Sequence, residues 1–112
     1  MSAMSADILI ALCTCPDAAL ADHIAETLVG EGLAACVNAL PGVSSVYRWQ
    51  GEVQRDAEVL LLIKTTQARL SGLTDRVRQL HPYDLPEVIA IPVSGGLPDY
   101  LQWVITCTSP DA

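Results

Sequence analysis

An α+β fold, with helices packed on one face of an antiparallel sheet, is predicted by three features of this 112-residue sequence. Two long apolar strand candidates, Leu33–Trp49 and Glu52–Thr66, are joined only by Gln50-Gly51, which indicates a β-hairpin. One apolar run of strand length precedes this hairpin, and another follows it. Two segments with apolar residues at helical spacing separate the hairpin from these two runs.

The hairpin organises the chain because it is longer than the domain to which it belongs. An extended run from Ala34 to Trp49 spans about 50 Å at roughly 3.3 Å per residue, whereas a domain of about 100 residues is only about 35 Å across. A two-residue turn pairs Tyr47 with Gln54 and places aromatic side chains near the tip. Pro41-Gly42 interrupts the first strand, and we expect a bend and a register shift there. Because too little chain is left to cover such a ribbon, we infer an obligate homo-oligomer.

The elements before the hairpin are a strand and a helix. Ile8–Cys13 is a continuous apolar run and is predicted to be a central strand, which the chain leaves near Cys15. A helix then begins with Pro16-Asp17 and ends at Gly32, which suits a left-handed C-terminal cap. The four-residue spacing of its apolar stripe indicates an amphipathic helix: Leu20, Ile24 and Leu28.

The elements after the hairpin repeat this order. Thr66 is predicted to cap a second helix that ends at His81, because Pro82 disfavours helical geometry in the residue before it. Glu87–Val93 is predicted to be a strand, with its proline marking an edge or the end of pairing. Pro98-Asp99 opens a short additional helix.

The resulting order, βαββαβ, is ferredoxin-like: both long helices cover one face of a four-stranded antiparallel sheet, and the extra C-terminal helix follows. We expect a flexible N-terminal tail over residues 1–6, a single domain over residues 7–107 and a C-terminal tail over residues 108–112. The second face of the sheet is left bare. Packing against other copies of the chain is the natural way to cover an apolar face of this kind.

Composition and charge exclude several classes of partner. Six Lys and Arg stand against thirteen Asp and Glu, a formal charge of −7, which disfavours phosphate backbones and anionic lipid surfaces. We therefore expect no nucleic acid and no membrane insertion, and the N-terminus lacks the basic segment of a signal peptide. Four cysteines without metal-finger or disulfide-framework spacing indicate free thiols and a cytoplasmic location.

Several motifs, in a fixed order, resemble one known family over nearly the whole chain. They are Leu12-Cys13-Thr14 with Pro16-Asp17, Leu33-Ala34-Ala35-Cys36-Val37-Asn38, Tyr47-Arg48-Trp49-Gln50-Gly51, Glu58 with Lys64-Thr65-Thr66, His81-Pro82-Tyr83-Asp84-Leu85-Pro86-Glu87, and Tyr100-Leu101 with Trp103. The family is that of the CutA divalent-cation tolerance proteins. The resemblance implies a ferredoxin-like homotrimer that is linked to copper and other divalent cations. It also implies Cys13 and His81 as metal ligands, and Leu80 stands where some members have a further histidine.

A cysteine and one imidazole make a partial metal site, which Glu58, water or a neighbouring subunit would complete. Each of these residues also has a structural interpretation. Cys13 ends a buried strand, where a free thiol most often only packs. His81 equally suits capping of a helix end, and Glu58 equally suits a salt bridge to another subunit. We expect copper, as Cu²⁺ or Cu⁺, to be dispensable for folding.

A small-ligand cleft is a separate expectation, with four candidate residues: Tyr47, Trp49, Lys64 and Tyr83. Lys64 would bind an anion between subunits, although a lysine at a strand end also commonly extends to solvent. The aromatic residues equally suit subunit interfaces. We expect no enzymatic activity, because no nucleophile has a nearby base in sequence and no glycine-rich phosphate loop is present.

Two functions therefore remain open. The first is a trimeric metal-binding or metal-tolerance protein that uses Cys13 and His81. The second is a trimeric signalling module, similar in architecture to the PII proteins, that binds a small anionic ligand between subunits. Retained copper that is lost in Cys13→Ala favours the first function, whereas a ligand-induced stability shift without metal favours the second.

Overall fold

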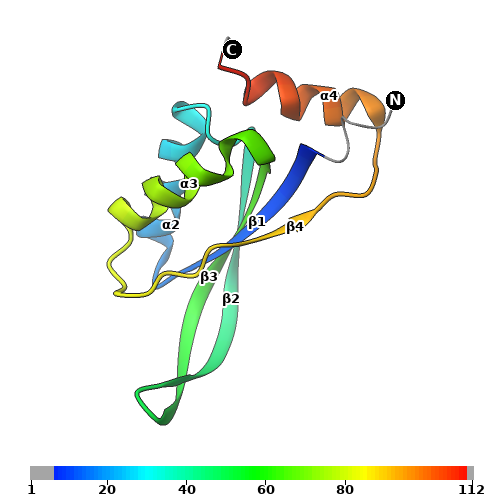
Figure 1. Ribbon diagram of the computed structural model, residues 1–112. Helices are drawn as coiled ribbons and strands as arrows, with labels where there is room; N and C mark the ends of the chain where they lie inside the picture. Colours follow the sequence, from blue (N-terminus) through cyan, green and yellow to red (C-terminus); the bar gives the residue numbers. More distant parts are fainter. Residues whose placement is uncertain (1–6, 111–112) are drawn as a thin grey trace.

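The computed structural model describes residues 7–110 and has the predicted α+β fold (Figure 1). The predicted N-terminal tail and the last two residues of the predicted C-terminal tail lie outside the described residues. The elements are, in order, β1 (Ile8–Cys15), α2 (Ala18–Gly30), β2 (Cys36–Trp49), β3 (Glu52–Thr66), α3 (Gln67–Leu80), β4 (Ile89–Pro92) and α4 (Pro98–Cys107). The four strands form one antiparallel sheet in the order β2-β3-β1-β4, which is the ferredoxin-like arrangement.

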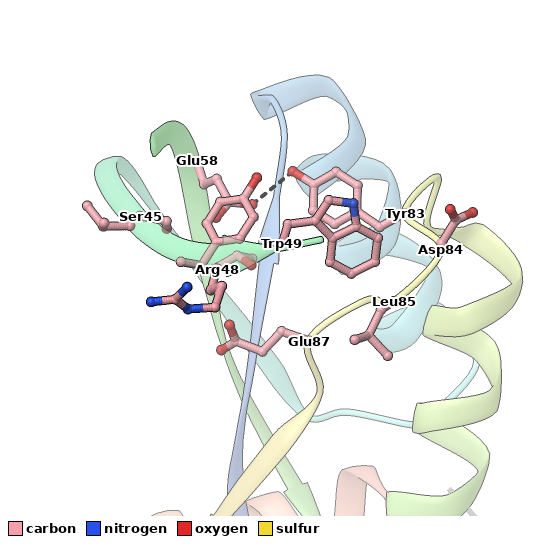
Figure 2. Close-up of a pocket in the computed structure, with 11 residues that line it drawn as sticks. Ser45, Arg48, Trp49, Glu58, Tyr83, Asp84, Leu85 and Glu87 are labelled. Carbon is pink, nitrogen blue, oxygen red and sulfur yellow. Dashed lines mark hydrogen bonds between the residues drawn. The ribbon is translucent and has the colours of Figure 1, made fainter. Parts of the chain in front are cut away.

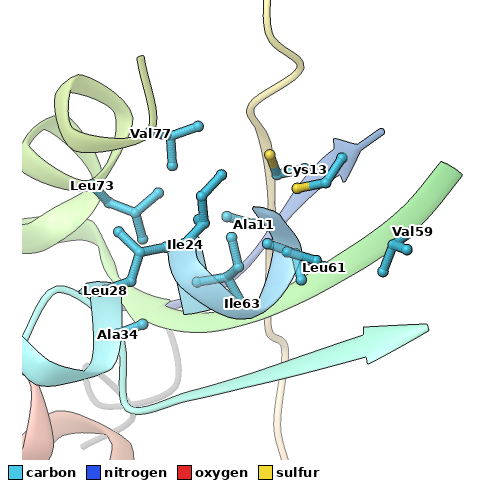
Figure 3. Packing of buried hydrophobic residues seen from close by; sticks show 12 residues of the cluster. Ala11, Cys13, Ile24, Leu28, Ala34, Val59, Leu61, Ile63, Leu73 and Val77 are labelled. Atoms are coloured by element: carbon cyan, nitrogen blue, oxygen red, sulfur yellow. The ribbon is translucent and has the colours of Figure 1, made fainter. Parts of the chain in front are cut away.

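The core lies between the sheet and the two long helices (Figure 3). Because side chains alternate along a strand, every second residue of the central strands β1 and β3 points towards α2 and α3. The buried residues of this layer are Ala11, Cys13, Cys15, Ala21, Ile24, Leu28, Ala34, Val59, Leu61, Ile63, Leu73 and Val77. Burial of each Leu, Ile or Val stabilises the fold by about 1.5–3 kcal/mol, so this layer is the main source of stability.

The first helix begins and ends where the sequence predicts. Asp17 is the N-cap of α2, and its carboxylate accepts a hydrogen bond of 2.8 Å from the backbone N–H of Leu20. At the other end Gly32 has a φ of +72°, the left-handed conformation that terminates many helices. The backbone N–H of Leu33 then donates to the carbonyl of Leu28 at 2.9 Å, which satisfies a carbonyl of the last turn.

The β2–β3 hairpin has the predicted two-residue turn and register. Tyr47 pairs with Gln54, and the turn residues Gln50 and Gly51 have φ angles of 52° and 83°. Positive φ at both positions is the type I′ turn, whose twist matches that of the strands. The hairpin extends beyond the helices (Figure 1), and the molecule measures 48 × 25 × 22 Å. The predicted overlength of the hairpin is therefore observed.

The predicted bend in β2 is a β-bulge. Leu40 pairs with Leu60, but Val43 pairs with Glu58, so β2 has one more residue than β3 over this stretch. Gly42 supplies the positive φ of +82° that the extra residue needs. The bulge decides which side chains near the tip share a face with Glu58.

The second face of the sheet is bare over β4, as predicted, but α4 covers one end of it, where Leu101 and Val104 pack on Ile8. On β4, Ile89 and Ile91 are 55% and 52% exposed. Their partners on β1, Leu12 and Ile10, lie on the same face and are half-buried. Apolar side chains of β4 and β1 thus lie together on the side away from α2 and α3.

The structure differs from the sequence prediction at the ends of three strands, and one of these differences is that β2 begins at Cys36 instead of Leu33. β1 continues two residues further, to Cys15, and β4 is shorter than predicted. Pairing between β1 and β4 stops at Leu12 with Ile89, because beyond it the carbonyl of Thr14 accepts a side-chain hydrogen bond. Thr66 is at the N-cap of α3 as predicted, but its hydroxyl donates to the Thr108 hydroxyl at 3.4 Å and makes no capping bond.

Candidate functional site

Two thiols and an imidazole meet at one end of the core. The extended backbone of β1 points Cys13 and Cys15 to the helix side of the sheet. His81 follows the last residue of α3, and its backbone N–H still bonds the carbonyl of Val77 at 2.9 Å. The two sulfurs and a ring nitrogen of His81 all lie within 4.8 Å of one another. All three residues are buried, with 0%, 0% and 6% of their surface exposed. We call these three residues the metal group.

Both ring nitrogens of His81 are hydrogen-bonded. Nε2 lies 2.8 Å from the carbonyl oxygen of Thr14, and Nδ1 accepts the backbone N–H of Tyr83 at 3.2 Å. Because Nδ1 accepts and Nε2 donates, the ring is neutral with its proton on Nε2. A metal ion that binds this imidazole must therefore replace one of the two hydrogen bonds.

The two thiols share one hydrogen bond and differ in acidity. The pKa of Cys13 is raised, first by its hydrogen bond with Cys15 and then by burial and by the charges of Glu87 and Glu58. The same hydrogen bond lowers the pKa of Cys15, against the effect of burial. Of the two thiols, Cys15 is therefore the one whose pKa favours the thiolate.

Glu58, the third predicted metal ligand, lies outside the metal group. Its neighbour Val59 belongs to the core on the helix side, and successive side chains of a strand point to opposite faces. The Glu58 carboxylate instead accepts a hydrogen bond of 2.8 Å from the hydroxyl of Tyr83. The structure therefore brings Cys13 and His81 together and places Glu58 on the opposite face of the sheet.

A pocket of about 630 Å³ lies between the hairpin tip and the connection from α3 to β4 (Figure 2). Figure 2 shows Trp49 and Tyr83 on neighbouring walls of this pocket. The hydrogen bond from Tyr83 to Glu58 joins the loop that follows α3 to strand β3. Its lining residues are Thr14, Ser45, Val46, Tyr47, Arg48, Trp49, Glu58, Tyr83, Asp84, Leu85 and Glu87. We call this cavity the aromatic pocket.

Of the four residues predicted to form a small-ligand cleft, Tyr47, Trp49 and Tyr83 line the aromatic pocket. Lys64 does not, because it lies six residues along β3 from Glu58, about 20 Å away at roughly 3.3 Å per residue. It lines a second, largely apolar pocket of about 320 Å³ instead, and its ammonium donates to the side-chain oxygen of Asn38. Within the single chain, Lys64 therefore lies apart from the other three predicted cleft residues.

The charges of the aromatic pocket oppose an anionic ligand. Glu58, Asp84 and Glu87 supply carboxylates, and Arg48 is the lining cation among the residues that the structure describes. Tyr47 also donates a hydrogen bond to Asp56, which adds a further carboxylate beside the pocket. An anion at this site meets like charges within a few ångströms, so the pocket itself gives no support to an anion-binding signalling function.

Comparison with known proteins identifies the family. The family model described as CutA1 divalent ion tolerance protein matches residues 9–107, which include the metal group and the aromatic pocket. The chain belongs to the CutA1 divalent ion tolerance family. The predicted family resemblance is confirmed.

Relatives and solved structures of CutA1 proteins agree with this. The divalent-cation tolerance protein CutA of Thermus thermophilus is 50% identical over 95 residues, which are 85% of this chain and 92% of that protein. The Protein CutA homolog of Xenopus laevis is 47% identical over 103 residues, 92% of this chain and 68% of that protein. The crystal structure of CutA1 from Oryza sativa is 43% identical, covers 96% of this chain and 98% of its own, and has a TM-score of 0.91. The Thermus thermophilus structure has a TM-score of 0.90 at 48% identity, over 91% of this chain and 99% of its own.

Within this CutA1 fold, Cys15 is the member of the metal group that the sequence analysis missed. Cys13 and Cys15 are two residues apart, and this spacing points both to one face of any strand that contains them. The sequence analysis ended the strand before Cys15, because Pro16 favours a helix start, and so left the second thiol out. Among residues 7–110, no helix is both long enough and apolar enough to span a bilayer.

Proposed function

We propose that this CutA1 protein binds copper through Cys13, Cys15 and His81, and that it serves divalent metal ion tolerance as a cytoplasmic homotrimer without catalysis. The observation that carries the proposal is the convergence of two thiols and an imidazole within 4.8 Å. The names of its relatives, which are divalent-cation tolerance proteins, support the same class of function.

The donor set suits copper for a chemical reason. Thiolate sulfur is a soft ligand that selects Cu(I), and imidazole binds copper in either oxidation state. For divalent ions the Irving–Williams order places Cu(II) above the other first-row metals at nearly any such site. The apolar surroundings of Cys13 and Cys15 further favour the lower charge of Cu(I). We therefore propose Cu(I) as the form bound most tightly.

The homotrimer is supported by two features of the single chain. The hairpin gives the molecule a long axis of 48 Å, with Val46 and Val53 near its tip 54% and 69% exposed. The bare face of the sheet adds Ile89 and Ile91 to the exposed apolar surface. Contacts with further copies of the chain bury both surfaces, whereas a lone chain leaves them in water.

The experiment is a competition titration of reduced protein with Cu(I) against a chromophoric chelator, under anaerobic conditions. We expect Cys13→Ala, Cys15→Ala and His81→Ala each to weaken binding at least tenfold, about 1.4 kcal/mol. Cys36→Ala and Cys107→Ala are matched controls, because these thiols lie outside the metal group. We expect both substitutions to leave the Cu(I) affinity unchanged. Because both thiols lose protons on coordination, binding is also to strengthen as the pH rises from about 5 to 8.

Thermal unfolding of each variant separates loss of a ligand from loss of the fold. If the three variants fold and bind Cu(I) as the parent protein does, the proposed site is wrong. If the parent itself retains no Cu(I) against the chelator, copper binding as a whole is wrong.

A further inference from the structure

The aromatic pocket concentrates a scarce type of side chain. The sequence contains two Trp, three Tyr and no Phe, and three of these five aromatic residues, Tyr47, Trp49 and Tyr83, line this one cavity. Tyr47 and Trp49 are 41% and 39% exposed, so their rings remain accessible from solvent in the single chain. Aromatic rings present a negative face, which attracts cations within about 6 Å.

Glu58 supplies a buried negative charge to the same pocket. Its side chain is on a residue that is only 8% exposed, and one carboxylate oxygen, Oε2, accepts the hydroxyl of Tyr83 at 2.8 Å. Within residues 7–110, no other hydrogen bond and no salt bridge to Glu58 is found. A carboxylate removed from water and given one neutral hydrogen bond is poorly compensated, and a cation beside it would supply the missing interaction.

The three carboxylates of the pocket do not converge on one point as a three-donor metal site would require. Among residues 7–110, the group of three or more His, Cys, Asp or Glu donors within 4.8 Å of one another is Cys13, Cys15 and His81. Glu58, Asp84 and Glu87 form no such group, although all three line the pocket. The distribution of charge around a cavity of about 630 Å³ fits a cation much larger than a metal ion.

We infer that the aromatic pocket binds an organic cation, an alkylammonium or quaternary ammonium group. The cationic head lies beside the Glu58 carboxylate and against the rings of Trp49 and Tyr83, and the hydrogen bond from Tyr83 holds Glu58 in place. Leu85 offers apolar surface to the alkyl part. This inference does not depend on copper, because the metal group lies on the other face of the sheet.

The test uses ligands of equal length and different charge. Trp103→Phe removes the tryptophan of α4, which does not line the pocket, and leaves Trp49 as the sole tryptophan. The fluorescence of this protein is followed during titration with n-butylammonium, n-butanol and butyrate. We expect n-butylammonium to bind at least tenfold more tightly than n-butanol, and butyrate to bind more weakly still. Tetramethylammonium, which cannot donate hydrogen bonds, is expected to bind through the ring faces.

Two substitutions of glutamate by glutamine, one at Glu58 in the pocket and one at Glu52 outside it, test the role of the carboxylate. In the Trp103→Phe background, Glu58→Gln keeps the shape of the side chain and is expected to lower n-butylammonium affinity at least tenfold. Glu52→Gln changes an acid on the same strand and the same sheet face that does not line the pocket, and it is expected to leave the affinity unchanged.

Three results would overturn the inference. They are the absence of saturable binding of either cation up to about 10 mM, equal binding of n-butylammonium and n-butanol, and unchanged binding in Glu58→Gln. Should Glu58→Gln fail to fold, Tyr83→Phe removes the hydroxyl that positions Glu58 and retains the ring. Unchanged n-butylammonium affinity in that protein counts against the inference in the same way.

Discussion

Nε2 of His81 lies 2.8 Å from the carbonyl oxygen of Thr14, and this hydrogen bond joins the end of α3 to the end of β1. Thr14 stands between the two thiols of the metal group. The ring of His81 also packs on the ring of Tyr83, with 4.5 Å between their centroids. One buried imidazole thus connects the metal group on one face of the sheet with a wall of the aromatic pocket on the other.

We expect His81→Ala to lower the free energy of unfolding by about 2–4 kcal/mol. The substitution removes a buried ring and leaves the Thr14 carbonyl without its donor, and each of these losses is costly. Urea unfolding followed by circular dichroism measures the difference. His23→Ala is the matched control, because His23 is exposed on α2. We expect this substitution to change the free energy of unfolding by no more than about 0.5 kcal/mol. Equal, small effects of the two substitutions would show that His81 contributes little to the fold.

Most of the fold could be predicted because its signals are local. The turn at Gln50-Gly51, the bulge at Pro41-Gly42 and the end of α3 before Pro82 each follow from the backbone preferences of one or two residues. The predicted end of β1 was wrong because pairing with β3, as far as Cys15 with Val59, extends the strand beyond Cys13. His81, 67 positions further along the chain than Thr14, also bonds the Thr14 carbonyl, and no residue near Cys15 predicts either contact.

The candidate site was predicted only in part, for a related reason. Cys13 and His81 were assigned together from the family resemblance, and the structure brings them into one group. Glu58 and Lys64 are charged residues whose partners, Tyr83 and Asn38, are set by the pairing of distant segments. A sequence pattern gives the face of a strand on which such residues lie, but it does not give the residue that meets them there.

The bulge in β2 should make Gly42 intolerant of a side chain. Its φ of +82° is strained for any L-residue, although a Cβ there meets no atom within 4 Å. We expect Gly42→Ala to destabilise the protein by about 1–2 kcal/mol through backbone strain alone. Gly30→Ala is the control, since a Cβ at this last residue of α2 also meets nothing within 4 Å and alanine favours helix. Urea unfolding is expected to show opposite signs for the two, and the same sign in both would argue against strain at the bulge.

The proposed trimer predicts a particle of three times the 11.9 kDa chain mass by light scattering coupled to size exclusion. Because unfolding then includes dissociation, the thermal midpoint should rise with protein concentration. We expect Ile91→Lys, on the bare face of the sheet, to break the assembly. Val29→Lys replaces a similarly exposed apolar residue on α2, away from that face, and is expected to leave the particle mass unchanged. A monomer mass for the parent protein contradicts the trimer.

The final prediction concerns stability at alkaline pH. The pKa of Tyr83 is raised above its usual value, first by burial and then by the hydrogen bond to Glu58 and the charge of that carboxylate. In the unfolded chain Tyr83 loses its proton near pH 10, while the folded chain still holds it, so above about pH 10 the unfolded state binds fewer protons. The contribution of Tyr83 to stability is therefore complete below about pH 10 and is lost as the pH rises towards the folded-state value.

Tyr83→Phe retains the ring against His81 but has no proton to lose. The measurement is the urea unfolding free energy of the parent and variant proteins at intervals from about pH 9 to 11.5. Thiols and the other tyrosines titrate in both proteins, so the difference between the two curves isolates Tyr83. We expect the advantage of the parent to be constant up to about pH 10 and to shrink above it, because the unfolded parent releases the Tyr83 proton in this range and is stabilised, while the folded parent keeps the proton in its bond to Glu58. Curves that stay parallel over the whole range would mean that the Tyr83 hydroxyl titrates alike in the folded and unfolded chains.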